Sequence, residues 1–230
     1  MPQFPKARLE QYLVVSHPGN LVLTDILMNT MCSLPIVQLN RDTLHSPYSA
    51  LRQVCKEVDV TNDSELTAAH GVITEMFRSL YADPSGVALA APQIGILQQI
   101  VVISYHDRDS DASPLMVLIN PRVRAVSSET EEGEEVCLSV PRLSGIVDRA
   151  KTVEVEGYDQ QGVAVKFPAS GFLGRIVQHE VDHLAGVLFV DRAKGDLKGI
   201  PDFPDRRLEP TVRKLKLRPR KHASAPDRDH

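Results

Sequence analysis

The sequence predicts an α+β fold in which antiparallel β-sheets pack around a C-terminal helix that carries an HExxH motif. Two patterns indicate the sheets: a β-branched run at residues 100–105, and an alternation of valine with glutamate at 152–158, the period of a half-buried strand. A third pattern indicates the helix, because apolar residues recur at helical spacing from about 171 to 184. This helix is short, apolar on more than one side and preceded by strands, so we expect it to lie against the sheets.

The chain begins with an N-terminal extension, residues 1–34. Its apolar spacing favours a helix on the protein surface. Residues 61–81 predict a second helix, because Asn62 and Glu65 resemble a capping box and apolar side chains follow one stripe. Further strands are expected at 116–119 and at 163–167, the latter pairing with 152–158 across a turn. The acidic run 129–135 is interpreted mostly as a solvated loop or strand edge.

The chain is expected to contain one catalytic domain, residues 35–192, followed by a basic tail, residues 193–230. Prolines such as Pro201, Pro204 and Pro210 prevent a long helix in the tail. Its many arginines and lysines favour a solvated, flexible segment. The alternative is an electrostatic, salt-sensitive contact with RNA, such as that of the ribosome.

Composition argues against several classes of protein. No apolar stretch is long enough to span a membrane, and the net charge of −4 gives no overall attraction to nucleic acid or lipid. Three cysteines do not indicate a disulfide framework, so a reducing compartment is the simpler inference. The first residues do not resemble a secretory signal. We therefore expect a cytoplasmic protein.

The strongest local signal is the sequence HEVDH at residues 179–183. On a helix, His179 and His183 project from one face and can share a metal ion, for which neutral imidazoles suit Zn²⁺ or Fe²⁺. Glu180 is rotated by roughly 100° and can reach a water at that ion. Because many helices contain HExxH by chance, the motif alone leaves metal-dependent hydrolysis and an ordinary helix both open.

A catalytic metal needs a third protein ligand, and Cys137 is the best candidate. It lies in an apolar segment, and its thiolate would complete a His₂Cys site. The other interpretation is a buried structural cysteine, which we also adopt for Cys32 and Cys55.

Three separated motifs resemble those of the peptide deformylase family. Residues 86–93, GVALAAPQ, resemble the family's GxGLAAPQ, and residues 135–139, EVCLS, resemble EGCLS. Residues 178–186, QHEVDHLAG, match QHExDHLxG in full. The motifs stand in the family's order and are together far more specific than HExxH, and the resemblance covers roughly residues 35–192.

The resemblance implies a hydrolase that removes the N-formyl group from the N-terminal formyl-methionine of newly made polypeptides. One divalent metal is implied, Fe²⁺ in the cell with Zn²⁺ or Ni²⁺ as substitutes, bound by three residues: Cys137, His179 and His183. Glu180 would carry the proton of the attacking water to the leaving amine. The Gln93 side-chain amide and the Leu138 backbone N–H would hold the oxyanion.

The resemblance also implies where the peptide binds. The backbone of Gly86, Val87 and Ala88 would pair with it as an added strand. An apolar pocket for the methionine side chain would be lined by Val87, Phe172, Ile176 and part of His179. The expected partners are N-formyl-methionyl nascent peptides, and the chain is expected to be monomeric. Glu135 and Asp182 would either orient the ligand histidines or pair with arginines such as Arg149 and Arg175.

Two glycines of the family motifs are replaced beside the expected substrate path. Ala88 and Val136 stand in their places, and valine disfavours a positive φ angle. Arg142 also stands where many members carry glycine. Two functions therefore stay open: an active deformylase with altered substrate tolerance or rate, and a deformylase-like paralogue that acts as a binding or regulatory module.

Overall fold

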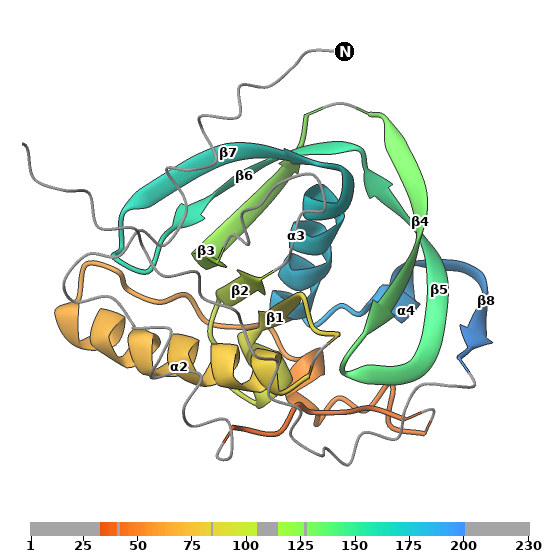
Figure 1. The fold of residues 1–230 in the computed structure, drawn as a ribbon, viewed down its shortest axis with the longest axis horizontal. Helices are drawn as coiled ribbons and strands as arrows, with labels where there is room; N and C mark the ends of the chain where they lie inside the picture. The colour runs from red at the N-terminus through yellow and green to blue at the C-terminus, as the bar shows by residue number, and fades with distance from the viewer. Residues whose placement is uncertain (1–32, 41, 84, 105–114, 127, 201–230) are drawn as a thin grey trace, which may run out of the picture.

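The computed structural model describes residues 33–40, 42–83, 85–104, 115–126 and 128–200. Within these ranges the protein has a mixed α+β architecture, which confirms the α+β class and the antiparallel sheets expected from the sequence. Figure 1 shows the central helix α3 (Gly171–Leu184) between the two sheets, with helix α2 (Asp63–Ala82) across one side. None of the helices in the described ranges is long and apolar enough to cross a membrane.

The larger sheet has five antiparallel strands in the order β1-β2-β3-β6-β7. Their bounds are β1 Ala88–Ala90, β2 Ile100–Ser104, β3 Leu115–Ala125, β6 Thr152–Tyr158 and β7 Ala164–Ser170. The valine–glutamate alternation predicted β6 correctly: Val153 and Val155 are fully buried, whereas Glu154 and Glu156 pair with basic side chains at the surface. Strand β1 is an edge, because it has a partner strand only on its β2 side.

The smaller sheet has three antiparallel strands in the order β4-β5-β8. Their bounds are β4 Thr130–Cys137, β5 Val140–Ala150 and β8 Ala193–Gly199. The acidic run that we expected to be mostly loop or strand edge is strand β4, an edge strand whose Glu132 and Glu134 face solvent while Glu135 is buried. The short helix α4 (Phe189–Arg192) precedes β8.

Helix α2 begins as the sequence predicts, because the Asn62 side chain accepts hydrogen bonds from the N–H groups of Ser64 and Glu65. Its buried face packs on the larger sheet. The cluster formed there includes Ile73, Met76 and Leu80. On the other side of that sheet, α3 contributes Ile176, Val177 and Leu184 to a second apolar cluster.

The predicted boundary of the catalytic domain at residue 192 is too early. Residues 193–199, which we assigned to the tail, form β8 and pair with β5 from Val147↔Ala193 to Leu143↔Gly199. This strand covers a sheet edge that would otherwise expose its backbone polar groups. The rest of the tail, from residue 201, and the predicted N-terminal helix lie outside the described residues.

Candidate metal centre

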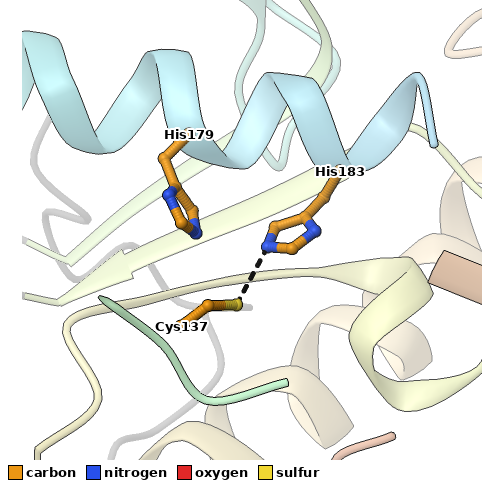
Figure 2. Close-up of side chains that lie close together, drawn as sticks. All are labelled: Cys137, His179 and His183. Carbon is orange, nitrogen blue, oxygen red and sulfur yellow. Dashed lines mark hydrogen bonds between the residues drawn. The ribbon is translucent and has the colours of Figure 1, made fainter. Parts of the chain in front are cut away.

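Two secondary-structure elements bring the three predicted metal ligands together. Helix α3 carries His179 and His183 one turn apart, so both rings leave the same face. Cys137 ends strand β4, just before the tight turn into β5. Figure 2 shows both imidazoles pointing from α3 toward the Cys137 sulfur.

The donor atoms of this cluster fit one small divalent cation. Atoms of Cys137, His179 and His183 that can act as ligands all lie within 4.8 Å of one another. The Cys137 Sγ is 3.3 Å from His183 Nε2, close to the roughly 3.5 Å expected for sulfur and nitrogen on one tetrahedral ion. One thiolate and two imidazoles suit a first-row transition metal such as iron, nickel or zinc, and do not suit magnesium or calcium.

The two histidines differ in their affinity for a proton. Burial disfavours a charge on His179, but bonds to Cys137 and Glu135 outweigh it and raise the pKa of His179 well above its ordinary value. Burial, together with the charge of His179, lowers the pKa of His183 far below its ordinary value. The centre thus stabilises one positive charge between Cys137 and Glu135, as a cation site requires.

Glu180 lies on the same helix turn and is buried, with 5% of its surface exposed. Burial, reinforced by the negative charge of Glu135, raises the pKa of Glu180 to about 7, although the charge of His179 acts in the opposite direction. Its Oε2 atom has no hydrogen-bond partner among the described residues. A buried carboxyl group in this state can accept a proton from a water and release it again near neutral pH.

Gln93 is held with its amide NH₂ group toward the thiolate. It lies on the 3₁₀ turn Ala91–Ile94 that follows β1, and its Oε1 accepts a 2.8 Å bond from the Ala90 N–H. The opposite end, Nε2, lies 3.2 Å from Ser139 Oγ and 3.7 Å from Cys137 Sγ. Sequence reasoning missed Ser139, which orients this amide from the residue two positions after Cys137.

A buried ionic network connects β4, β5, α3 and α4 behind the ligands. The Arg149 guanidinium donates two bonds of 2.9 Å to the Glu135 carboxylate and a third to Asp182. Glu135 Oε2 lies 2.9 Å from His179 Nδ1, while Asp182 also accepts from Arg192. Of the two roles that the sequence left open, Glu135 therefore combines both, and Asp182 pairs with arginines.

Helix α4 supports the centre, although no pattern in the sequence indicates this helix. The Phe189 ring stacks on the His179 ring with 6.2 Å between their centroids, and Arg192 holds Asp182. Four residues are too few for a periodic pattern, so this contribution could be found only from the folded chain.

The residues expected to bind substrate lie beside the centre in different environments. Ile176 is buried in the apolar cluster under α3, and Val87 packs against the same cluster. Phe172 and Val136 are more than half exposed, so they do not line a closed pocket in this structure. Gly86 has no space for a side chain, because a Cβ atom there would lie 2.7 Å from Leu80 Cδ1 and 3.2 Å from Leu138 Cδ1.

Of the three replaced glycines, only one has a left-handed backbone. Ala88 and Val136 lie in strands, and neither has a positive φ angle, so the backbone conflict considered for Val136 does not arise. Arg142 has a φ of 65° and occupies an irregularity in the β4–β5 pairing. The conformational cost of losing glycine thus falls on Arg142.

Comparison with known proteins agrees with this site. A family model described as polypeptide deformylase matches residues 35–198. Peptide deformylase 2 of Ralstonia nicotianae is 44% identical over 150 residues, which are 64% of this chain and 82% of that protein. Peptide deformylase of Thermosynechococcus vestitus is 42% identical over 144 residues, covering 63% of this chain and 73% of that one.

Solved structures of similar proteins include complexes with bound ligands. A peptide deformylase from Synechococcus elongatus in complex with actinonin is 37% identical, with a TM-score of 0.58 over 70% of this chain and 79% of that chain. A class I type b peptide deformylase from Acinetobacter baumannii with bound Met-Ala-Ser is 34% identical. Its TM-score is 0.58, over 70% of this chain and 99% of that chain.

Proposed function

The chain belongs to the peptide deformylase family, and from this premise we propose that it hydrolyses the N-formyl group of formyl-methionyl peptides at the centre formed by Cys137, His179 and His183. The observation that carries the proposal is the convergence of one thiolate and two imidazoles, with donor atoms within 4.8 Å, beside a buried carboxyl group. Helix α3, packed between the two sheets, is the scaffold that fixes the two imidazoles.

Different residues of the chain are proposed to bind the metal, to transfer the proton and to stabilise the oxyanion during hydrolysis. A divalent cation on the three ligands would polarise the formyl carbonyl and lower the pKa of the attacking water. Glu180 takes a proton from that water as the water oxygen attacks the formyl carbon. Glu180 then gives the proton to the amine nitrogen as the C–N bond breaks. The products are formate and a free N-terminal amine. Gln93 Nε2 and the Leu138 N–H donate hydrogen bonds to the oxyanion.

The peptide is proposed to bind between the two sheet edges that flank the centre. Strands β1 and β4 are both edge strands, and each has unpaired backbone groups available to an extended peptide. Gly86, Val87 and Ala88 form the β1 side, and Val136 lies on the β4 side. Val87, Ile176 and Phe172 would contact the methionine side chain. Phe172, 58% exposed, would become buried when the substrate binds.

The native metal is proposed to be Fe²⁺, with Zn²⁺ or Ni²⁺ as substitutes. The thiolate and imidazole ligands accept all three ions, so the donor set alone does not choose among them. Metal analysis of protein purified without oxygen tests this choice: iron close to one atom per chain supports the proposal, and zinc in its place contradicts it.

The alternative function, a deformylase-like paralogue without activity, receives no specific support. Gln93, Cys137, His179, Glu180 and His183 are all present, and this retention supports activity. Gln93 lies beside Cys137, and Glu180 follows His179 on α3. A binding module would not require, beside two imidazoles, a buried carboxyl group whose Oε2 atom lacks a hydrogen-bond partner among the described residues.

The cellular setting remains part of the proposal. The substrate is made where translation begins with formyl-methionine, so we place the enzyme in the cytoplasm as a monomer. The basic tail from residue 201 lies outside the described residues, and its proposed ribosome contact rests on charge alone. Sedimentation with ribosomes at increasing salt tests that contact, since an electrostatic one weakens steeply.

The activity test uses full-length protein reconstituted with Fe²⁺ without oxygen, and formyl-Met-Ala-Ser as substrate. We expect release of formate and a free amine by the unaltered protein. Glu180→Gln keeps the size of the side chain and removes the proton acceptor, so kcat should fall by at least about a hundredfold while bound metal is retained. No turnover by the unaltered, metal-loaded protein would contradict the proposal.

A further inference from the structure

The Arg175 side chain connects helix α3 to both strands of the hairpin that carries Cys137. Its Nη1 donates to Glu135 Oε1 at 3.0 Å and to the Val147 carbonyl of β5 at 2.9 Å. Its Nη2 donates to the Glu131 carbonyl of β4 at 2.7 Å. The side chain is 16% exposed, so these bonds are well shielded from water.

With Arg175 in place, each oxygen of the Glu135 carboxylate has two donors. Oε1 accepts from Arg149 and Arg175, and Oε2 accepts from Arg149 and lies 2.9 Å from His179 Nδ1. Arg175 and His179 are four residues apart on one face of α3. Helix α3 therefore contacts both oxygens of the Glu135 carboxylate, Oε1 through Arg175 and Oε2 through His179.

Strand β4 has a glycine where the guanidinium lies. A Cβ atom at Gly133 would be 2.7 Å from Arg175 Cζ and 2.8 Å from Nη2. Gly133 is on the same strand face as Glu135 and Cys137, so its missing side chain leaves room for the arginine beside the centre.

We infer that Arg175 is a positioning residue that fixes the orientation of the His179 imidazole through Glu135. Arg149 holds the carboxylate in a fork and connects it indirectly to α3 through Asp182. Arg175 adds a direct bond from α3 to Glu135 one turn before His179, so the carboxylate, the His179 ring and the helix keep one relative geometry. The inference rests on the proposed function, because it assumes that His179 binds the metal.

The test is the rate at which full-length, Ni²⁺-loaded protein releases its metal to excess EDTA under native conditions. Arg175→Met removes all three hydrogen bonds and should accelerate release about tenfold, the lower end of effects seen for groups that orient metal ligands. Arg175→Lys keeps a charge near Glu135 and should give an intermediate rate. Gly133→Ala should also accelerate release, because its methyl group displaces the guanidinium while the charge remains.

Arg124→Met is the matched control, since Arg124 on β3 forms an exposed ion pair with Glu154 on β6. Its release rate should equal that of the unaltered protein. Urea unfolding of the metal-free variants separates positioning from stability. If the Arg175 variants lose stability but release Ni²⁺ at the unaltered rate, Arg175 has only a structural role and the inference is overturned.

The outcomes also separate this inference from the proposed function. If the unaltered protein binds no Ni²⁺, the proposed function fails. If it binds Ni²⁺ tightly and neither Arg175→Lys nor Gly133→Ala accelerates release, only the inference fails. These two milder variants carry the test if Arg175→Met does not fold.

Discussion

Helices α2 and α3 both pack against the larger sheet, but their buried faces carry different kinds of side chain. The buried residues of α2 are apolar except for Ser79. Helix α3 buries Glu180, Asp182 and His183 in addition to its apolar residues. Buried charged groups are costly unless they are paired. Asp182 is paired with Arg149 and Arg192, whereas Glu180 Oε2 has no hydrogen-bond partner among the described residues. The comparison indicates that α2 chiefly stabilises the fold. Helix α3 instead buries polar groups of the candidate metal centre, at a cost in folding free energy.

The largest expected effect is on the α3 side. Arg149→Met should lower the free energy of unfolding by about 3–5 kcal/mol, because it leaves Glu135 and Asp182 as buried carboxylates without their shared partner. It should also accelerate metal release, since Glu135 lies against His179. Urea unfolding of metal-free protein measures the first effect, and Ni²⁺ release measures the second. Unchanged stability would mean that the network is not a structural necessity.

On the α2 side, Met76→Ala should lower the free energy of unfolding by about 2–5 kcal/mol. Met76 is fully buried between α2 and the sheet, so truncation leaves a cavity. Because this substitution leaves no buried charged group without its partner, the rate of Ni²⁺ release should not change. Faster release at an equal loss of stability would show that the two helices do not divide their roles as described.

The smallest expected effect concerns backbone strain at Arg142, which lies on neither helix. Arg142→Gly should raise the free energy of unfolding by about 0.5 kcal/mol, because relief of a left-handed backbone exceeds the entropy that glycine adds to the unfolded chain. Arg124→Gly is the control, since Arg124 is exposed on β3 without a positive φ angle and should lose stability instead. Equal losses in both variants would show that Arg142 is not strained.

Sequence reasoning succeeded where periodicity or motif spacing was strong. Helix α2, with its Asn62 cap, and strand β6 follow from local patterns. The three metal-ligand candidates follow from spacing and family resemblance, and the structure brings their side chains together. These features depend on few residues that are close in the chain or fixed by one helix turn.

Other features depend on contacts that a sequence does not reveal. Strand β4 was interpreted mostly as a solvated loop or strand edge because of its run of glutamates, and only the folded chain shows that Glu135 is buried and paired with Arg149. Strand β8 has only two apolar side chains, Ala193 and Leu197, which is too weak a pattern to indicate a strand, and it pairs with the β5 edge. The half-exposed positions of Phe172 and Val136 likewise depend on how two sheets meet, which no local pattern encodes.

The central claim is that one cation is held jointly by the Cys137 thiolate and the imidazoles of His179 and His183. X-ray absorption at the nickel edge of Ni²⁺-loaded protein tests it most directly. We predict one sulfur and two imidazole nitrogens around the ion, with the sulfur contribution lost in Cys137→Ser. A spectrum of the unaltered protein that contains only oxygen and nitrogen neighbours would contradict the account.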